Sequence, residues 1–249
     1  MLELARLGGG RELVFYDQRG GGKSRPNDTR QITWNTQVED LAAVIAEFAL
    51  ERPIVVGYSW GGLLAMLYAS EAARNRELPR PGALVLIDPA PISRQYRRTF
   101  EAEFARRQSS AAVERMRREL ADSGLRERDM AAYRQRNFEL SVAGYFEKPE
   151  SAKDLTPFRV TARVQQSVWD SLGDFDLAAD GRLRDIQLPA LIVHGRQDPI
   201  PLASSEEAAR VMGAQLVALD HCGHVPYVEQ PAALFAAIDS FLRELRVAA

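Results

Sequence analysis

The sequence predicts an α/β protein in which helices cover both faces of a parallel sheet, and three observations lead to this prediction. Short apolar runs rich in β-branched residues alternate with longer segments of helical periodicity. Hydrophobic residues make up 46% and charged residues 27% of the 249 residues, which are ordinary values for a globular chain. No apolar run is long enough to span a membrane. Alternation of strand and helix favours parallel strands joined by helices.

Each expected element corresponds to one such run or segment. The apolar runs predict buried strands over Glu12–Tyr16, Ile54–Val56, Ala83–Ile87, Ala190–Val193 and Gln215–Leu219. The periodic segments predict helices over Thr33–Leu50, Trp60–Arg74, Ser204–Met212 and Pro231–Val247.

The alternation stops between Pro91 and about Asp180, where the chain has helical periodicity and no convincing strand. We therefore expect a first part of the core over residues 1–91, a helical cap insertion over 92–180, and a second part of the core over 181–249. Loops at the carboxyl ends of parallel strands carry function, so an insertion at this point can cover a site.

The motif Gly57-Tyr58-Ser59-Trp60-Gly61 lies between a predicted strand and a predicted helix. Such a tight reversal holds the serine in strained backbone angles and projects it from the sheet. We expect side chains at Gly57 and Gly61 to clash with this turn. Ser59 is therefore the candidate nucleophile, and the Trp60 N–H at the helix start is a candidate oxyanion donor.

Two phosphate-binding interpretations of the glycine-rich segments fail on one residue each. A dinucleotide-binding turn would need glycine where Ser59 stands. The segment Gly22-Lys23-Ser24 resembles the end of a phosphate-binding loop, but the first glycine of that loop would fall on Asp17.

A nucleophilic serine needs a base, and the chain has three histidines. His224 follows the last predicted strand in a loop with Gly223 and Pro226, and we choose it as the base. His221 in the same loop is the alternative. His194 ends the preceding strand, where we expect it to pack or to form local hydrogen bonds.

The acid that orients the base should follow a strand and precede the histidine. Asp198 meets both conditions, and the order Ser59, Asp198, His224 agrees with the order of nucleophile, acid and base. Asp88, at the end of the strand Ala83–Ile87, is the alternative acid, although we expect a structural role for it.

Three motifs carry a resemblance to a known family: Asp17-Gln18-Arg19-Gly20 followed by Gly22 and Ser24, Gly57-Tyr58-Ser59-Trp60-Gly61-Gly62, and Gly223–Pro231. With them the chain resembles the α/β-hydrolase superfamily and, within it, the proline iminopeptidase group. The resemblance implies an α/β-hydrolase-type parallel sheet with an inserted helical cap. It also implies a serine hydrolase that cleaves small amides or esters through an acyl-enzyme, with N-terminal proline peptides as candidate substrates and no cofactor.

Two positions depart from the aminopeptidase pattern of this group. Pro199 follows the acid, where the resemblance would place a glutamate that helps to bind the substrate's ammonium group. Asp174, in Ser171–Phe175, is a candidate replacement carboxylate, and loop capping is its alternative role. Pro199 favours a carboxylesterase or lactonase as the alternative function. A non-catalytic binding protein on a hydrolase scaffold is the third interpretation.

Charge and cysteine content limit the remaining classes. A net charge of −2 gives no general attraction to nucleic acid or to an anionic membrane, so the expected partner is a small molecule or short peptide. The single cysteine, Cys222, cannot form an intrachain disulfide, and too few further ligands accompany it for a metal site. No signal peptide is visible, which favours a cytoplasmic protein. The oligomeric state stays open.

The start of the chain departs from the family pattern as well. By the resemblance, Glu12–Tyr16 is the fourth strand of the family's sheet, so three strands and a glycine-containing oxyanion loop should precede it. We therefore expect a shortened version of a protein roughly 40–60 residues longer. Loss of one oxyanion donor costs about a hundredfold in kcat, which predicts weak activity unless the turn Gly8–Gly10 supplies a donor.

Overall fold

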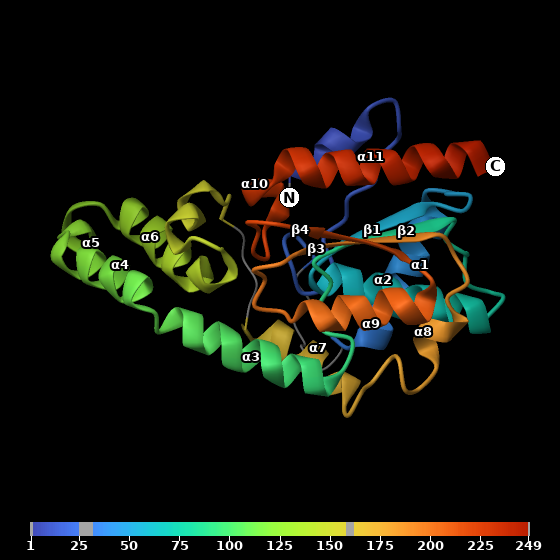
Figure 1. The fold of residues 1–249 in the computed structure, drawn as a ribbon, viewed down its shortest axis with the longest axis horizontal. Coiled ribbons are helices and arrows are strands. Elements are labelled where there is room, and N and C mark those ends of the chain that lie inside the picture. The colour runs from blue at the N-terminus through green and yellow to red at the C-terminus, as the bar shows by residue number, and fades with distance from the viewer. Residues whose placement is uncertain (1, 25–31, 158–161, 249) are drawn as a thin grey trace.

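The computed structural model describes residues 2–24, 32–157 and 162–248, and its described strands form one parallel sheet in the order β1-β2-β3-β4 (Figure 1). Each strand pairs in parallel with the next, for example Val56 with Val85 and Val85 with Leu191. The strands are β1 (Ile54–Tyr58), β2 (Ala83–Ile87), β3 (Ala190–Gly195) and β4 (Gln215–Leu219). The predicted α/β fold with a parallel sheet is therefore confirmed.

Helices cover both faces of this sheet (Figure 1). One face packs against α1 (Trp34–Glu47), α2 (Trp60–Arg74), α8 (Arg182–Asp185) and α9 (Leu202–Met212). The other face packs against η1 (Leu2–Gly8) and α11 (Pro231–Ala248). In β2, Leu84 and Leu86 face the first layer, whereas Val85 and Ile87 face the second. Because both faces of the strand are buried, its sequence is a continuous apolar run.

All four predicted helices are present, and their ends differ from the prediction by at most three residues. The bounds of α2 agree at both ends. Thr33 caps α1, since its side chain accepts a hydrogen bond from the Thr36 N–H and the Thr36 hydroxyl accepts one from the Thr33 N–H.

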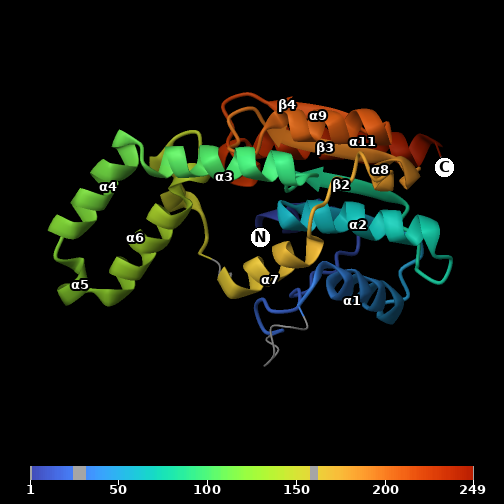
Figure 2. The ribbon, with the colours of Figure 1, turned by 90° about the horizontal axis from the view of Figure 1, so that it is seen from below.

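The chain between β2 and β3 folds into helices before it re-enters the sheet. The helix α7 packs beside α1, where Ser171 Oγ accepts a hydrogen bond of 2.9 Å from the Trp34 N–H. In contrast, α4, α5 and α6 extend away from the sheet (Figures 1 and 2). The elements are α3 (Arg94–Gln108), α4 (Ala111–Asp122), α5 (Leu125–Arg128), α6 (Met130–Val142), η3 (Ala143–Tyr145), η4 (Pro149–Asp154) and α7 (Ala162–Leu172).

The run Glu12–Tyr16 is not a strand, which corrects the sequence prediction. It is irregular, and Phe15 is 56% exposed. Among the described residues no strand lies beyond β1, whose Ile54 and Val56 are both more than a third exposed. An apolar run becomes a strand only when its backbone groups find partners in another strand, and this run pairs with none of the four described. Of the described helices, none has the length and apolarity needed to cross a membrane.

Candidate active site

The candidate site lies where the parallel strands end. Ser59 directly follows β1, Asp88 directly follows β2, and Asp198 lies in the loop after β3. His224 lies in the loop between β4 and α10 (Pro226–Glu229). Because the carboxyl ends of parallel strands share one edge of the sheet, side chains distant in sequence meet there.

Ser59 has the backbone of a strained turn between strand and helix. Its φ of 53° and ψ of −118° lie outside the usual regions for a residue with a side chain. Its N–H donates to the Ile87 carbonyl at 2.9 Å, and its own carbonyl accepts from the Ala90 N–H at 2.9 Å. These hydrogen bonds fix the turn to the end of β2, so the neighbouring strand helps to maintain the strain.

The glycines of this turn explain its tightness, with one change from the sequence prediction. A Cβ on Gly57 would lie 2.2 Å from the Gly61 carbonyl oxygen, so only glycine fits there. A Cβ on Gly61 would meet nothing nearer than Gln18 Nε2 at 4.0 Å, so the predicted clash at Gly61 is wrong. The second close approach is instead at Gly62, where a Cβ would lie 2.8 Å from Pro89 Cβ.

The structure brings Ser59, His224 and Asp198 into one hydrogen-bonded chain. His224 Nε2 lies 2.9 Å from Ser59 Oγ, and His224 Nδ1 lies 2.7 Å from Asp198 Oδ2. The other carboxylate oxygen of Asp198 accepts the Ile200 N–H at 2.7 Å, and the Tyr145 carbonyl accepts the His224 backbone N–H at 2.7 Å. This geometry lets a proton pass from the hydroxyl to an imidazole whose tautomer the carboxylate fixes.

Burial sets the electrostatics of this chain of groups. His224 is 3% and Asp198 6% exposed. Desolvation lowers the pKa of His224 to about 4, so the imidazole is neutral at pH 7 and can accept a proton. Desolvation raises the pKa of Asp198, whereas the neighbouring Asp88 side chain, the Ile200 N–H and the charge of Arg107 act in the opposite direction.

The other two histidines have different surroundings. The His221 side chain is 80% exposed, and its Nδ1 lies 3.1 Å from Glu147 Oε1. His194 is fully buried, and its ring nitrogens lie 3.1 Å from the Ile200 carbonyl and 2.9 Å from Ser205 Oγ. His224 is thus the histidine whose ring contacts Ser59 in the described part of the chain.

The oxyanion donor expected at Trp60 lies at the start of α2, where a backbone N–H has no acceptor within the helix. The Trp60 indole donates to Gln37 Oε1 at 2.7 Å, which holds the residue against α1. The turn Gly8–Gly10, the other candidate for an oxyanion donor, lies at the end of η1. That helix packs with α11 on the face of the sheet opposite α1 and α2 (Figure 1). Near Gly61 lies the side chain of Gln18, whose Nε2 would be 4.0 Å from a Cβ at that position.

Asp174 lies in the loop after α7, and its side chain is 89% exposed. Its carboxylate is 3.8 Å from Arg94 Nη1. No contact in the described residues joins it to Ser59 or His224, so its role in binding substrate stays a prediction.

Several side chains around the triad were not identified from the sequence. The Tyr145 ring stacks on the His224 ring at 4.9 Å between centroids, and Phe104 lies 4.5 Å from Tyr145. Arg107, also on α3, donates to the Gln197 carbonyl beside the acid. The spacing of Phe100 and Phe104 on one helix face is a visible signal, but it does not reveal which residue they contact.

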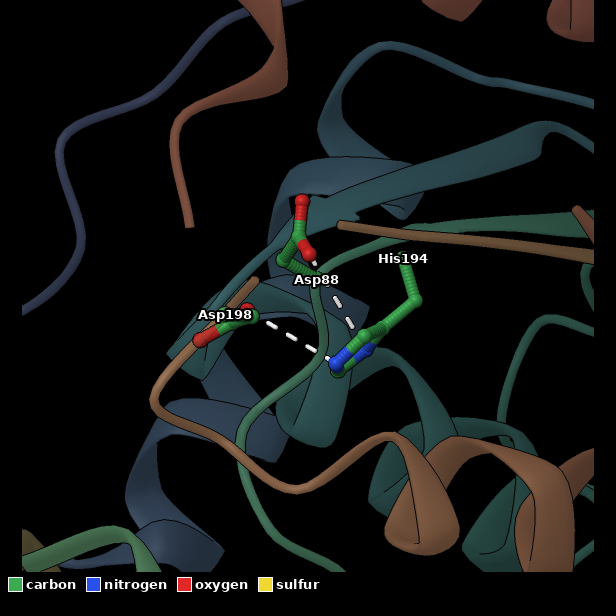
Figure 3. Close-up of side chains that lie close together, drawn as sticks. All are labelled: Asp88, His194 and Asp198. Atoms are coloured by element: carbon green, nitrogen blue, oxygen red, sulfur yellow. Dashed lines mark ion pairs between the residues drawn. The ribbon is translucent and has the colours of Figure 1, made fainter. Parts of the chain in front are cut away.

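One cluster of described residues offers possible metal ligands: Asp88, His194 and Asp198, whose ligand atoms lie within 4.8 Å of one another (Figure 3). Both nitrogens of His194 already form hydrogen bonds, and Asp198 Oδ2 already contacts His224. A bound cation would have to replace these contacts, so hydrogen bonding accounts for the cluster better.

Comparison with known proteins agrees with the fold. The chain is 26% identical over 242 residues to a proline iminopeptidase of Lactobacillus delbrueckii subsp. bulgaricus, covering 90% of this chain and 77% of that one. It is 27% identical over 252 residues to a 2-hydroxymuconate semialdehyde hydrolase of Pseudomonas sp. (strain CF600), covering 100% and 82%. The crystal structure of the Mycobacterium smegmatis proline iminopeptidase superposes with a TM-score of 0.67 at 19% identity, covering 99% and 85%.

The sequence profile of the alpha/beta hydrolase family matches residues 1–238. That match covers nearly the whole chain, including every strand of the sheet and the residues Ser59, Asp198 and His224. The chain belongs to the alpha/beta hydrolase family.

Proposed function

We propose that this protein is a serine hydrolase that cleaves small amide or ester substrates through an acyl-enzyme. The observation that carries the proposal is the unbroken chain of contacts from Ser59 through His224 to Asp198, with the serine on a strained turn. Nucleophile, base and acid within hydrogen-bond reach of one another are the geometric mark of an activated serine.

In the proposed reaction Ser59 Oγ attacks the substrate carbonyl while His224 Nε2 accepts its proton. Asp198 keeps the proton of His224 on Nδ1 and stabilises the imidazolium that forms. The Trp60 N–H donates to the oxyanion of the tetrahedral intermediate. His224 then protonates the leaving group, and water releases the acyl group with His224 again as base.

Residues 92–180 act in this proposal as a cap that selects the substrate. The aromatic cluster of Phe100, Phe104 and Tyr145 adjoins His224 and offers an apolar surface for an acyl or leaving group. We name peptides with an N-terminal proline as the first candidate substrates, because the chain shares its Asp17–Gly20 and Gly57–Gly62 motifs with the proline iminopeptidase group.

Two observations favour a neutral ester or lactone as the second candidate substrate class. Pro199 stands beside the acid, where it offers no carboxylate for an ammonium group. Asp174 is 89% exposed and lies near Arg94, so its attraction for a substrate cation is screened by water and partly balanced.

A serine-directed fluorophosphonate probe tests the proposal. It should label the wild type at Ser59, and Ser59→Ala should abolish both labelling and turnover of aminoacyl amides and aryl esters. Loss of the nucleophile from such a triad lowers kcat by about a millionfold. Ser141→Ala removes an exposed serine on α6 and should leave labelling unchanged. Persistent labelling of Ser59→Ala at another serine would overturn the assignment, and absence of labelling in the wild type would favour a non-catalytic binding protein.

A further inference from the structure

A second buried carboxyl group, that of Asp88, lies next to Asp198 of the candidate triad. Asp88 is fully buried at the end of β2 and has a φ of 39°, an angle that few side-chain-bearing residues adopt. Its Oδ1 accepts the Gly195 N–H at 2.8 Å. Its Oδ2 is also buried and has no hydrogen-bond partner in the structure as described. A carboxylate with one unsatisfied oxygen and no exposure is costly, because charge in a buried site needs donors or a counterion.

The side chain of His194 lies close to both Asp88 and Asp198 (Figure 3), but it does not supply a counterion. Asp88 Oδ1 lies 3.9 Å from His194 Nδ1, and Asp198 Oδ2 lies 3.8 Å from His194 Nε2. The Ile200 carbonyl, 3.1 Å from His194 Nε2, can only accept, so that nitrogen carries the proton. His194 Nδ1 then accepts from the Ser205 hydroxyl. Burial lowers the pKa of His194 to about 4, so this ring is neutral at pH 7.

The remaining titratable groups around Asp88 are also uncharged or negative in the resting site. Among the described residues, the titratable groups that interact with Asp88 include no permanent cation; they are Tyr58, His194, Asp198, Cys222, His224 and Tyr227. The charge of Arg107 acts on Asp198, from α3. The carboxyl groups of Asp88 and Asp198 have oxygens within 4.8 Å of each other, with no cation between them. They cannot both be ionised without a large cost in free energy, as in other paired buried acids.

The hydrogen bonds decide which acid keeps the proton. Asp198 accepts from two donors, His224 Nδ1 and the Ile200 N–H, which favour its ionised form. Asp88 accepts from one donor only. We therefore propose that Asp88 is a neutral carboxylic acid in the folded protein, so that the buried Asp88–Asp198 pair carries a single negative charge, located on Asp198.

This arrangement makes Asp88 a positioning residue. It supports the end of β3 through Gly195 without adding a second negative charge beside Asp198 and His224. Burial and the neighbouring Asp198 raise the pKa of Asp88 well above its usual range, in agreement with the geometry. The effect on acyl transfer rests on the proposed function, whereas the protonation of Asp88 does not.

Stability as a function of pH tests the protonation directly. In the unfolded chain Asp88 ionises near pH 4, so a folded state that keeps the proton must release it on unfolding. A raised folded-state pKa thus gives stability at low pH that is lost as pH rises towards that pKa. The wild-type unfolding constant divided by that of Asp88→Asn should rise with pH above about pH 5, by about tenfold per pH unit as long as folded Asp88 keeps its proton.

The matched control is Asp122→Asn, which changes an exposed aspartate at the end of α4. Its ratio to wild type should not depend on pH over the same range, because the Asp122 side chain is exposed to water and contacts no buried charge in the structure as described. A pH-independent ratio for Asp88→Asn as well would show that folded Asp88 is ionised and would overturn the proposal. If Asp88→Asn does not fold, the infrared spectrum of the wild type decides, because a protonated buried carboxyl gives a C=O band that an ionised one lacks.

Activity tests the positioning role. Asp88→Asn keeps the size of the side chain, an acceptor for Gly195 and a neutral charge, so kcat should stay within about threefold of wild type. Asp88→Leu removes the acceptor and should lower kcat about tenfold or more with little change in KM, since an unpaired buried N–H remains at Gly195. Equal losses in both variants would mean that the site needs a charged Asp88, which contradicts the proposal. An inactive wild type that still shows the pH-dependent stability ratio would disprove the proposed function and leave the neutral Asp88 in place.

Discussion

Two helices of the same length, α2 and α3, show how differently the core and the insertion are built. Both have 15 residues, but α2 has ten buried residues and α3 has none. The helix α2 begins directly after the candidate nucleophile and packs against α1 and the sheet, whereas α3 carries Phe104 and Arg107 towards the candidate site. A catalytic serine must be held within fractions of an ångström, and dense packing around α2 supplies that restraint.

The insertion contacts the triad at few points. The Tyr145 carbonyl accepts a hydrogen bond from the His224 backbone N–H, and the Tyr145 ring stacks on the His224 ring. Arg107 donates a hydrogen bond to the Gln197 carbonyl. Beyond these contacts, α4 to α6 extend away from the core (Figure 2). In α4 only Val113 is buried, so substitutions on this outlying helix should cause little loss of stability. We therefore expect core variants to change chemistry and stability, and insertion variants to change selectivity.

The largest expected difference concerns the acid and its neighbour from the insertion. Asp198→Asn should lower kcat by about ten-thousandfold, because the amide cannot hold His224 in the reactive tautomer. Arg107→Met removes one hydrogen bond to the acid loop and should lower kcat only about tenfold. Steady-state kinetics on an activated ester would measure both. A loss for Arg107→Met as large as that for Asp198→Asn would show that α3 is as essential for catalysis as the acid.

The loss of stability on substitution should also differ between the two regions. Leu86 on β2 is fully buried, so Leu86→Ala should lower the free energy of unfolding by about 2–5 kcal/mol. Met116 on α4 is half-buried, so Met116→Ala should cost less than about 1 kcal/mol. Denaturant unfolding of both variants checks the difference. Similar losses would show that α4 is packed as tightly as the sheet.

The parts of the molecule that the sequence predicts are those in which burial leaves a pattern. Strands covered on both faces, such as Ala83–Ile87, are continuous apolar runs, and the strand-to-helix turn at Ser59 requires glycine at Gly57. Ser59, Asp198 and His224 each follow a predicted strand, which is enough to place all three at the same edge of a parallel sheet.

The sequence could not predict what depends on a distant partner. Glu12–Tyr16 has the composition of a strand but pairs with none of the described strands, and composition does not reveal which strand, if any, lies beside a run. The close approach that requires glycine at Gly62 comes from Pro89, in another loop. The contacts of Tyr145 and Arg107 with the histidine and acid loops join residues that are about 80 to 90 positions apart, with no local pattern to connect them.

The smallest expected effect is at Asp174, and it tests whether the insertion closes over a substrate. With 89% of its side chain exposed and Arg94 at 3.8 Å, Asp174 should contribute as an exposed charge does, so Asp174→Asn should lower kcat/KM for free-amine substrates at most about fivefold. Turnover of neutral esters should not change, because no cation is then bound. A loss of tenfold or more on amines alone would mean that substrate binding buries Asp174, since only a desolvated charge pair gives such an effect. That result would favour the aminopeptidase over the esterase, whereas equal losses on amines and esters would mean that Asp174 only stabilises its loop.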